Sequence, residues 1–214
     1  MNYLDLVNEV LKRLREDEVT SIFENQLSTL VSTMINDARR KVEQSHDWTT
    51  LRKDIVVPTV KGIEEYSIAG TQNRATIIDV RDPTSGCMLH KVPSKWIRKQ
   101  YIGEVGETRP TRYALTGVDS SGDTQITFWG KPDGVYKIKV HVAQRETDLS
   151  AAGDKTSLPA EPIYLLATAM ACIERGDVGT GDAKMWAEMA DSSLSRYIML
   201  DRAQNPDEDI WEAV

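Results

Sequence analysis

The sequence contains little cysteine and histidine. Its two cysteines, Cys87 and Cys172, lie far apart among 214 residues. A disulfide scaffold or a cysteine-based zinc site is therefore not supported, and a reducing compartment fits better. Two of the three histidines, His90 and His141, fall in predicted strands without a partner at a metal-ligand spacing. We therefore expect neither a metal nor a cofactor.

Long apolar runs are also missing. No stretch approaches the roughly 20 apolar residues that a membrane span needs, and the opening "MNYLDLVNEVLKRLRED" lacks the apolar core of a signal peptide. We expect no contact with a membrane. The formal charge of -7 argues against broad binding to a phosphate backbone, which needs clustered Lys and Arg.

Catalytic motifs are lacking as well. No serine lies in a G-x-S-x-G elbow, and the glycine-bearing segments at 70–76 and 176–182 do not match a phosphate-binding loop.

His46 beside Asp47 could indicate acid–base chemistry, but neighbours on a helix point in different directions. We interpret His46 as a helix-end residue that contacts terminal carbonyls. Paired carboxylates could cleave a glycoside, but 33 acidic residues single out no pair. We assign no catalytic residue.

Helical periodicity is clearest in the first 47 residues. Leu4, Val7, Leu11 and Leu14 share one face of a predicted helix over 3–15. Ser21 and Glu24 have the spacing of a capping box that opens a second helix, which runs to about residue 47. Its apolar stripe is Leu27, Leu30, Val31, Met34, Ile35, Ala38 and Val42. Its opposite, solvated side is expected to carry Asn36, Asp37, Arg39, Arg40, Lys41 and Glu43.

Residues 50–147 consist of short, β-branched segments separated by Gly, Pro and Asn, which predicts a small antiparallel sheet or barrel. "GKPDG" at 130–134 is a turn signal, and the strand after it has apolar residues at Val135, Ile138, Val140 and Val142. "WIRKQY" at 96–101 mixes aromatic with basic residues, which is typical of nucleic-acid stacking. We favour a short helix over 93–101 that packs Trp96 and Ile97 on the sheet.

Helical patterns return after a loop at 148–159. "AEPIYLLATAMACIERG" is apolar almost throughout, which indicates burial on several sides. A fourth helix over 182–203 follows, with an apolar side formed by Met185, Trp186, Met189, Leu194, Tyr197 and Ile198. The fold class is therefore α+β, with about four helices from both chain ends forming a bundle and a β-domain inserted between them. The expected divisions are 1–49 and 148–203 for the bundle, 50–147 for the β-domain and 204–214 for an extended C-terminal arm.

The arm combines acidic residues with a large apolar pair, Ile210 and Trp211, and contains no Lys or Arg. Pro206 stops the fourth helix from continuing. One interpretation is a frayed terminus with a stray tryptophan. The other is a partner-binding peptide, in which the aromatic residue is the hot spot and the acids steer it toward a basic groove.

Three stretches together resemble the head-to-tail adaptor (connector) proteins of short-tailed and related phages. They are "MNYLDLVNEVLKRLREDEVTS", "INDARRKVEQSHDWTTLR" and "VPTVKGIEEYSI". The pattern A-x-x-x-V-E-x-x-x-D-W-x-x-L is similar to the family's helix-to-strand junction and is formed here by Ala38, Val42, Glu43, Asp47, Trp48 and Leu51. The order of two helices, a β-rich insertion, two helices and a tail also fits.

The resemblance implies a structural virion protein, not an enzyme. Such adaptors form a dodecameric ring between the portal and a nozzle or tail tube protein, and DNA passes through without specific binding. The resemblance also implies synthesis in the host cytoplasm and a C-terminal arm that binds the portal. By location, that arm corresponds here to Asp207, Glu208, Asp209, Ile210, Trp211, Glu212 and Val214. Two alternatives stay open: a phage cell-wall hydrolase, and a regulatory binding module that forms no ring.

Overall fold

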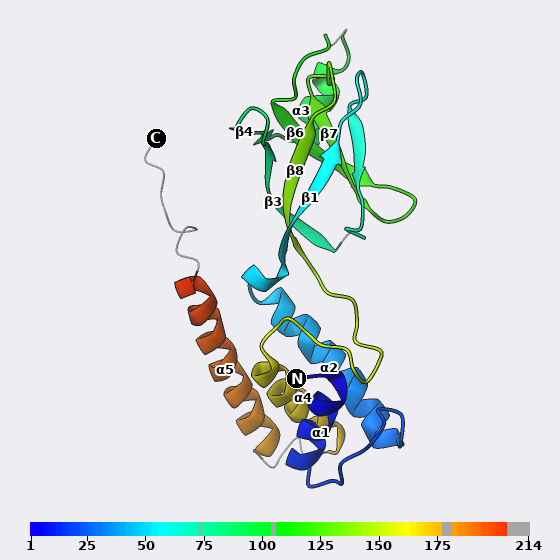
Figure 1. Cartoon of the computed structure of the whole chain (residues 1–214). Coiled ribbons are helices and arrows are strands. Elements are labelled where there is room, and N and C mark those ends of the chain that lie inside the picture. Colours follow the sequence, from blue (N-terminus) through cyan, green and yellow to red (C-terminus); the bar gives the residue numbers. More distant parts are fainter. Residues whose placement is uncertain (73, 104–105, 177–180, 205–214) are drawn as a thin grey trace. The chain divides into compact units, whose positions relative to one another are not determined.

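The computed structural model describes residues 1–72, 74–103, 106–176 and 181–204 (Figure 1). Its contacts divide the chain into two compact units. The helical unit comprises Met1–Leu51 together with Glu146–Val214, and the β unit comprises Arg52–Arg145. The predicted α+β class is confirmed, since the described residues form five α-helices and two small sheets. No helix in the described residues is long and apolar enough to cross a membrane.

In its described residues, the helical unit contains four α-helices and one short 3-10 helix. They are α1 (Tyr3–Arg13), α2 (Gln26–Gln44), η1 (Thr49–Leu51), α4 (Ala160–Glu174) and α5 (Asp182–Gln204). Helix α4 packs against α1, α2 and α5. This confirms its predicted burial on several sides and explains why its sequence is apolar nearly all round. Helix α5 packs mainly against α4.

The second helix begins later than the sequence suggested. The predicted capping box at Ser21 and Glu24 forms only in half and opens no helix. The Glu24 carboxylate accepts from the backbone N–H of Ser21 as predicted, but the Ser21 hydroxyl accepts from the backbone of Phe23 and not of Glu24. The N-cap of α2 is Asn25, whose side chain accepts from the backbone of Ser28 at 2.7 Å while Ser28 Oγ accepts from the backbone of Asn25. This reciprocal pair satisfies two backbone donors that the helix start leaves free.

The helical core joins α1, α2 and α4. Leu6, Val7, Val10 and Leu11 of α1 are fully or almost fully buried, whereas the predicted face members Leu4 and Leu14 are only partly covered. From α2, the core takes Val31, Met34, Ile35, Ala38 and Val42. Leu30, also predicted for this stripe, is 40% exposed because it lies at the edge of the contact.

The described part of the β unit forms eight strands and one helix. They are β1 (Arg52–Pro58), β2 (Glu65–Ile68), β3 (Ala75–Asp82), β4 (Cys87–Met88), β5 (His90–Lys91), α3 (Ser94–Gln100), β6 (Arg112–Val118), β7 (Thr124–Trp129) and β8 (Lys137–Gln144). They form two four-stranded sheets, ordered β1-β8-β3-β4 and β2-β7-β6-β5. All pairings are antiparallel except β5 with β6. No closed barrel is present in the described part of the unit.

One apolar cluster is shared by the two sheets. Its members from the first sheet include Val57, Val80 and Ile138, and those from the second include Ile126 and Phe128. The alternation predicted for the last strand is confirmed at Ile138, Val140 and Val142, which are all fully buried. It is wrong at Val135, which is 75% exposed because it precedes the first paired residue of β8.

Two local predictions for the β unit are confirmed. Gly130 opens the turn with a φ of 59°, and a Cβ there would overlap the Thr108 side chain, so the position needs glycine. Helix α3 buries Ile97, and its Trp96 meets Trp129 edge to face at 5.5 Å. Arg112 lies over both indole rings. Trp96 and Ile97 of this segment therefore pack on the sheet, whereas its basic residues Arg98 and Lys99 are exposed.

Candidate interaction surface of the helical unit

Helix α5 leaves an apolar face uncovered. Met185, Met189, Met199 and Leu200 are between 45% and 71% exposed, and the three methionines share one face of the helix with Ser192 and Arg196. The sequence assigned Met185 and Met189 to the buried side. That assignment is wrong, because the six predicted apolar positions span a wide arc of the helix and α4 covers only part of it.

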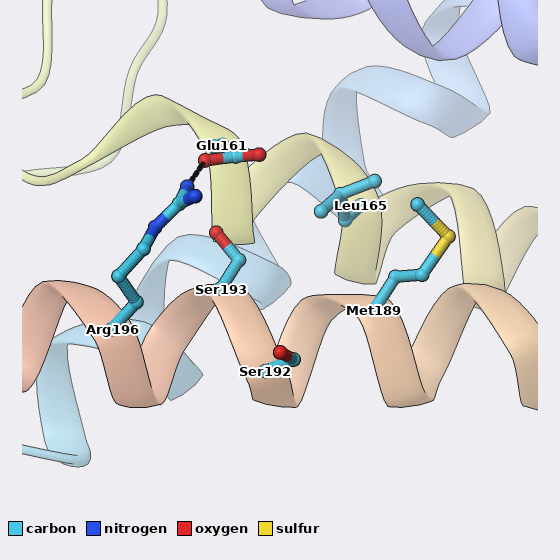
Figure 2. Close-up of a pocket in the computed structure, with 6 residues that line it drawn as sticks. All are labelled: Glu161, Leu165, Met189, Ser192, Ser193 and Arg196. Carbon is cyan, nitrogen blue, oxygen red and sulfur yellow. Dashed lines mark hydrogen bonds and ion pairs between the residues drawn. The ribbon is translucent and has the colours of Figure 1, made fainter.

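A groove lies along this face, between α4 and α5 (Figure 2). Its walls are Glu161 and Leu165 of α4 and Met189, Ser192, Ser193 and Arg196 of α5, and it encloses about 230 Å³. In the figure, Glu161 and Arg196 form an ion pair that joins the two helices. Leu165 and Met189 supply the apolar part of the lining.

Ser193 is the unusual residue of the groove. The residue is 6% exposed, and its Oγ is buried without a hydrogen-bond partner among the described residues. A buried hydroxyl without a partner costs about 1–3 kcal/mol relative to a satisfied one. The groove therefore holds an unused polar atom beside an apolar wall, which is the composition of a site that orients a bound group.

The last turn of α5 is held by a separate contact. Asp201 Oδ2 lies 3.0 Å from His46 Nε2 and also accepts hydrogen bonds from the backbone and hydroxyl of Thr49. The prediction that His46 contacts the carbonyls at the end of its own helix is wrong. Val42 O, one of these carbonyls, already accepts from Ser45 Oγ and from the indole of Trp48. His46 therefore links the segment that follows α2 to the last turn of α5.

The side of α2 that the sequence assigned to solvent is partly buried. Asn36, Arg39 and Glu43 are at most 9% exposed, which corrects the predicted solvated side. They hold the segment that returns from the β unit: Asn36 bonds both the backbone N–H and the backbone C=O of Leu149. Glu43 accepts from the backbone N–H of Glu146 at 2.7 Å.

Arg39 is fully buried and pairs with two carboxylates of that segment. Its Nη1 lies 3.0 Å from Glu146 and its Nη2 lies 3.3 Å from Asp148. Burial alone would raise the pKa of Glu146, but hydrogen bonds from Ser157 and Thr156 and the charge of Arg39 together lower it. The network fixes the start of the 146–159 segment on α2, so its role is structural.

The remaining candidates do not converge on a reaction site. His90 is exposed in β5, and His141 Nδ1 lies 2.8 Å from Asp54 on the neighbouring strand β1. Among the residues whose positions the structure describes, no group of three or more His, Cys, Asp or Glu could hold a metal ion. The predicted arm residues Asp207, Glu208, Asp209, Ile210, Trp211, Glu212 and Val214 lie outside the described residues.

The sequence does not reveal the groove, because the methionines of α5 fit a buried core as well as an exposed surface. A helix that carries three methionines at steps of four and ten residues indicates an adaptable surface for a partner as readily as a core. The pairing of Arg196 with Glu161 could not be read from the sequence, since 35 positions separate the two residues.

The sequence matches a known protein family. The family described as SU10 adaptor protein matches residues 1–209. Among curated proteins, none matches the sequence significantly.

Proposed function

The chain belongs to the SU10 adaptor protein family, and from this premise we propose that it forms a dodecameric ring between the portal and a nozzle or tail tube protein. Membership agrees with the resemblance to phage head-to-tail adaptors, and the protein is accordingly a structural adaptor of the virion. The family match over 1–209 is the observation that carries the proposal, because it covers the β unit and nearly all of the helical unit; it ends before Ile210 and Trp211.

The helical unit offers a surface suited to ring contacts. A closed ring repeats one heterologous contact between two different faces of each copy. The exposed apolar face of α5 can supply one of these faces, since three methionines adapt to a partner at little cost. Twelve weak contacts then reinforce one another around the ring. The net negative charge suits a conduit through which DNA passes without binding.

We further propose that the segment from Asp207 to Val214 is the portal-binding arm. Ile210 and Trp211 would provide the hot spot, and the neighbouring acids would favour a basic groove on the portal. Position supports this assignment: α5 ends at Gln204, and the contacts of Asp201 with His46 and Thr49 fix the last turn from which the arm starts.

The ring is tested by electron microscopy of the protein mixed with its purified portal. We expect a twelvefold ring of density beneath the portal and no such ring when the portal is omitted. A persistent monomer or dimer in the mixture would favour the regulatory module instead. Turnover of peptidoglycan, abolished by one carboxylate substitution without unfolding, would favour the hydrolase.

The arm is tested by Trp211→Ala. If Trp211 is a hot spot of ordinary size, the dissociation constant for the portal rises by a factor that corresponds to about 2 kcal/mol or more. Trp211→Phe is the matched control, because it keeps an aromatic anchor and should retain most of the affinity. Surface plasmon resonance on immobilised portal measures both variants. An unchanged constant for Trp211→Ala would remove Trp211 from the interface.

A further inference from the structure

The groove between α4 and α5 has the chemistry of a tryptophan site. Its apolar wall is formed by Leu165 and Met189, and a methionine thioether packs favourably against an aromatic ring. Its polar point is Ser193 Oγ, which is buried and has no partner in the described structure. An indole needs an apolar slot for the ring and one acceptor for its N–H.

We propose that Trp211 of the same chain docks into this groove before the protein meets a partner. The indole would lie between Leu165 and Met189 and donate its Nε1–H to Ser193 Oγ. This satisfies a buried polar atom of the groove that has no partner among the described residues. It also removes from water a large apolar side chain and part of the exposed methionine face.

The length of chain between α5 and Trp211 allows the contact. Seven residues lead from Gln204 to Trp211 and span at most about 23 Å at ~3.3 Å per residue. Ser193 lies eleven residues before Gln204, which is about 16 Å along a helix that rises ~1.5 Å per residue. The difference leaves about two residues for reversal of the chain, and Pro206 stands where helical continuation has to stop.

The charges at the groove are compatible with this occupant. Arg196 is paired with Glu161, but a guanidinium has five N–H donors and can accommodate a second carboxylate. Glu212 follows Trp211 directly and can approach Arg196 when the indole is bound. Glu161 opposes that approach. The expected gain is therefore small, and the indole, not the acids, determines the affinity.

The consequence for assembly rests on the proposed portal-binding role of the arm. A docked Trp211 is hidden from other molecules, so a free protein would not use its arm until a portal competes for it. The same groove, once vacated, would expose Met189 for a neighbouring copy. Docking in the free chain is a separate claim, and its test contains no portal.

The test is ¹⁹F NMR of the full chain labelled with 5-fluorotryptophan. The five tryptophans give five resonances, and Trp211→Phe identifies that of Trp211. A synthetic peptide of residues 204–214 supplies the unbound reference. We expect the Trp211 resonance of the wild-type chain to differ from the peptide reference and to move to it in Met189→Glu. Coincidence of the wild-type resonance with the peptide would overturn the proposal.

Met199→Glu is the matched control, because Met199 lies on the same helix, is 71% exposed and does not line the groove. It should leave the Trp211 resonance in place. The resonance of Trp48, a buried member of the helical core, reports unfolding. If Met189→Glu shifts the Trp48 resonance, Ser193→Ala is the variant that tests the site. It should shift only the Trp211 resonance toward the peptide reference. No movement in either folded variant would refute the site.

Dilution identifies the occupant. Docking within one chain gives a Trp211 resonance that does not depend on protein concentration. A resonance that returns to the peptide position on dilution would show that the groove binds the arm of a second copy, which contradicts docking within the chain.

Discussion

Helices α2 and α5 belong to the same unit, but α2 buries polar side chains as well as apolar ones, whereas α5 leaves large apolar side chains exposed. Helix α2 carries the fully buried Arg39 and the nearly buried Asn36 and Glu43. Each of these side chains contacts the 146–149 segment. Helix α5 exposes methionines on the face that α4 does not reach. The difference follows from the number of elements that cover each helix. Helix α2 packs against α1 and α4 and also holds the 146–149 segment, whereas α5 packs mainly against α4.

The largest expected effect is that of Arg39→Ala in α2. Removal of one member of a buried ion pair leaves Glu146 without its compensating charge and costs about 3–5 kcal/mol. Arg40→Ala is the control on the next residue, since Arg40 is about half exposed and surface pairs contribute about 1 kcal/mol or less. Denaturant unfolding measures both. Equal losses would contradict the distinction between the buried and exposed sides of α2.

Truncation of one apolar residue in each helix sharpens the comparison. Ile35 of α2 is fully buried, so Ile35→Ala should lower the free energy of unfolding by about 2–5 kcal/mol. Met189 of α5 is 45% exposed, so Met189→Ala should change it by about 0.5 kcal/mol or less. Thermal and denaturant unfolding of the two variants provide the comparison. A large loss for Met189→Ala would contradict the distinction between the buried face of α2 and the exposed face of α5.

A smaller effect concerns pH. The pKa of Glu146 is lowered from its ordinary value of 4.5 in the folded protein, so its contribution to stability is present above that value. The contribution is lost as the pH falls through the lower, folded pKa. Glu146→Gln should remove this part of the acid dependence. Between neutral pH and pH 3, the free energy of unfolding should therefore fall less steeply for Glu146→Gln than for the wild-type chain. Parallel curves would exclude Glu146 as a source of acid sensitivity.

The elements themselves were largely predictable. Repeats of three and four residues located α1, α4 and α5 to within about two residues at each end, and β-branched alternation located the strands around the buried Ile138, Val140 and Val142. The start of α2 was missed because two cap-like pairs occur close together. The sequence alone does not show that Asn25 and Ser28, not Ser21 and Glu24, close the reciprocal bonds.

The candidate surface was much less predictable. Met185 and Met189 have the spacing of core residues, but among the described elements α5 packs mainly against α4, and this face is left exposed. Ser193 carries no distinguishing signal in the sequence, and its unpaired hydroxyl emerges only from packing. The arm was recognised from its composition, and its role as a portal-binding peptide stays a prediction.

The sequence by itself determined the order of the helices and strands, the family and the acidic, tryptophan-bearing segment, because these depend on local spacing and composition. Only the tertiary structure decided that Arg39 is buried and Met189 is not. Local periodicity shows which residues share a face of a helix, but the number of neighbouring elements determines how much of that face loses contact with water.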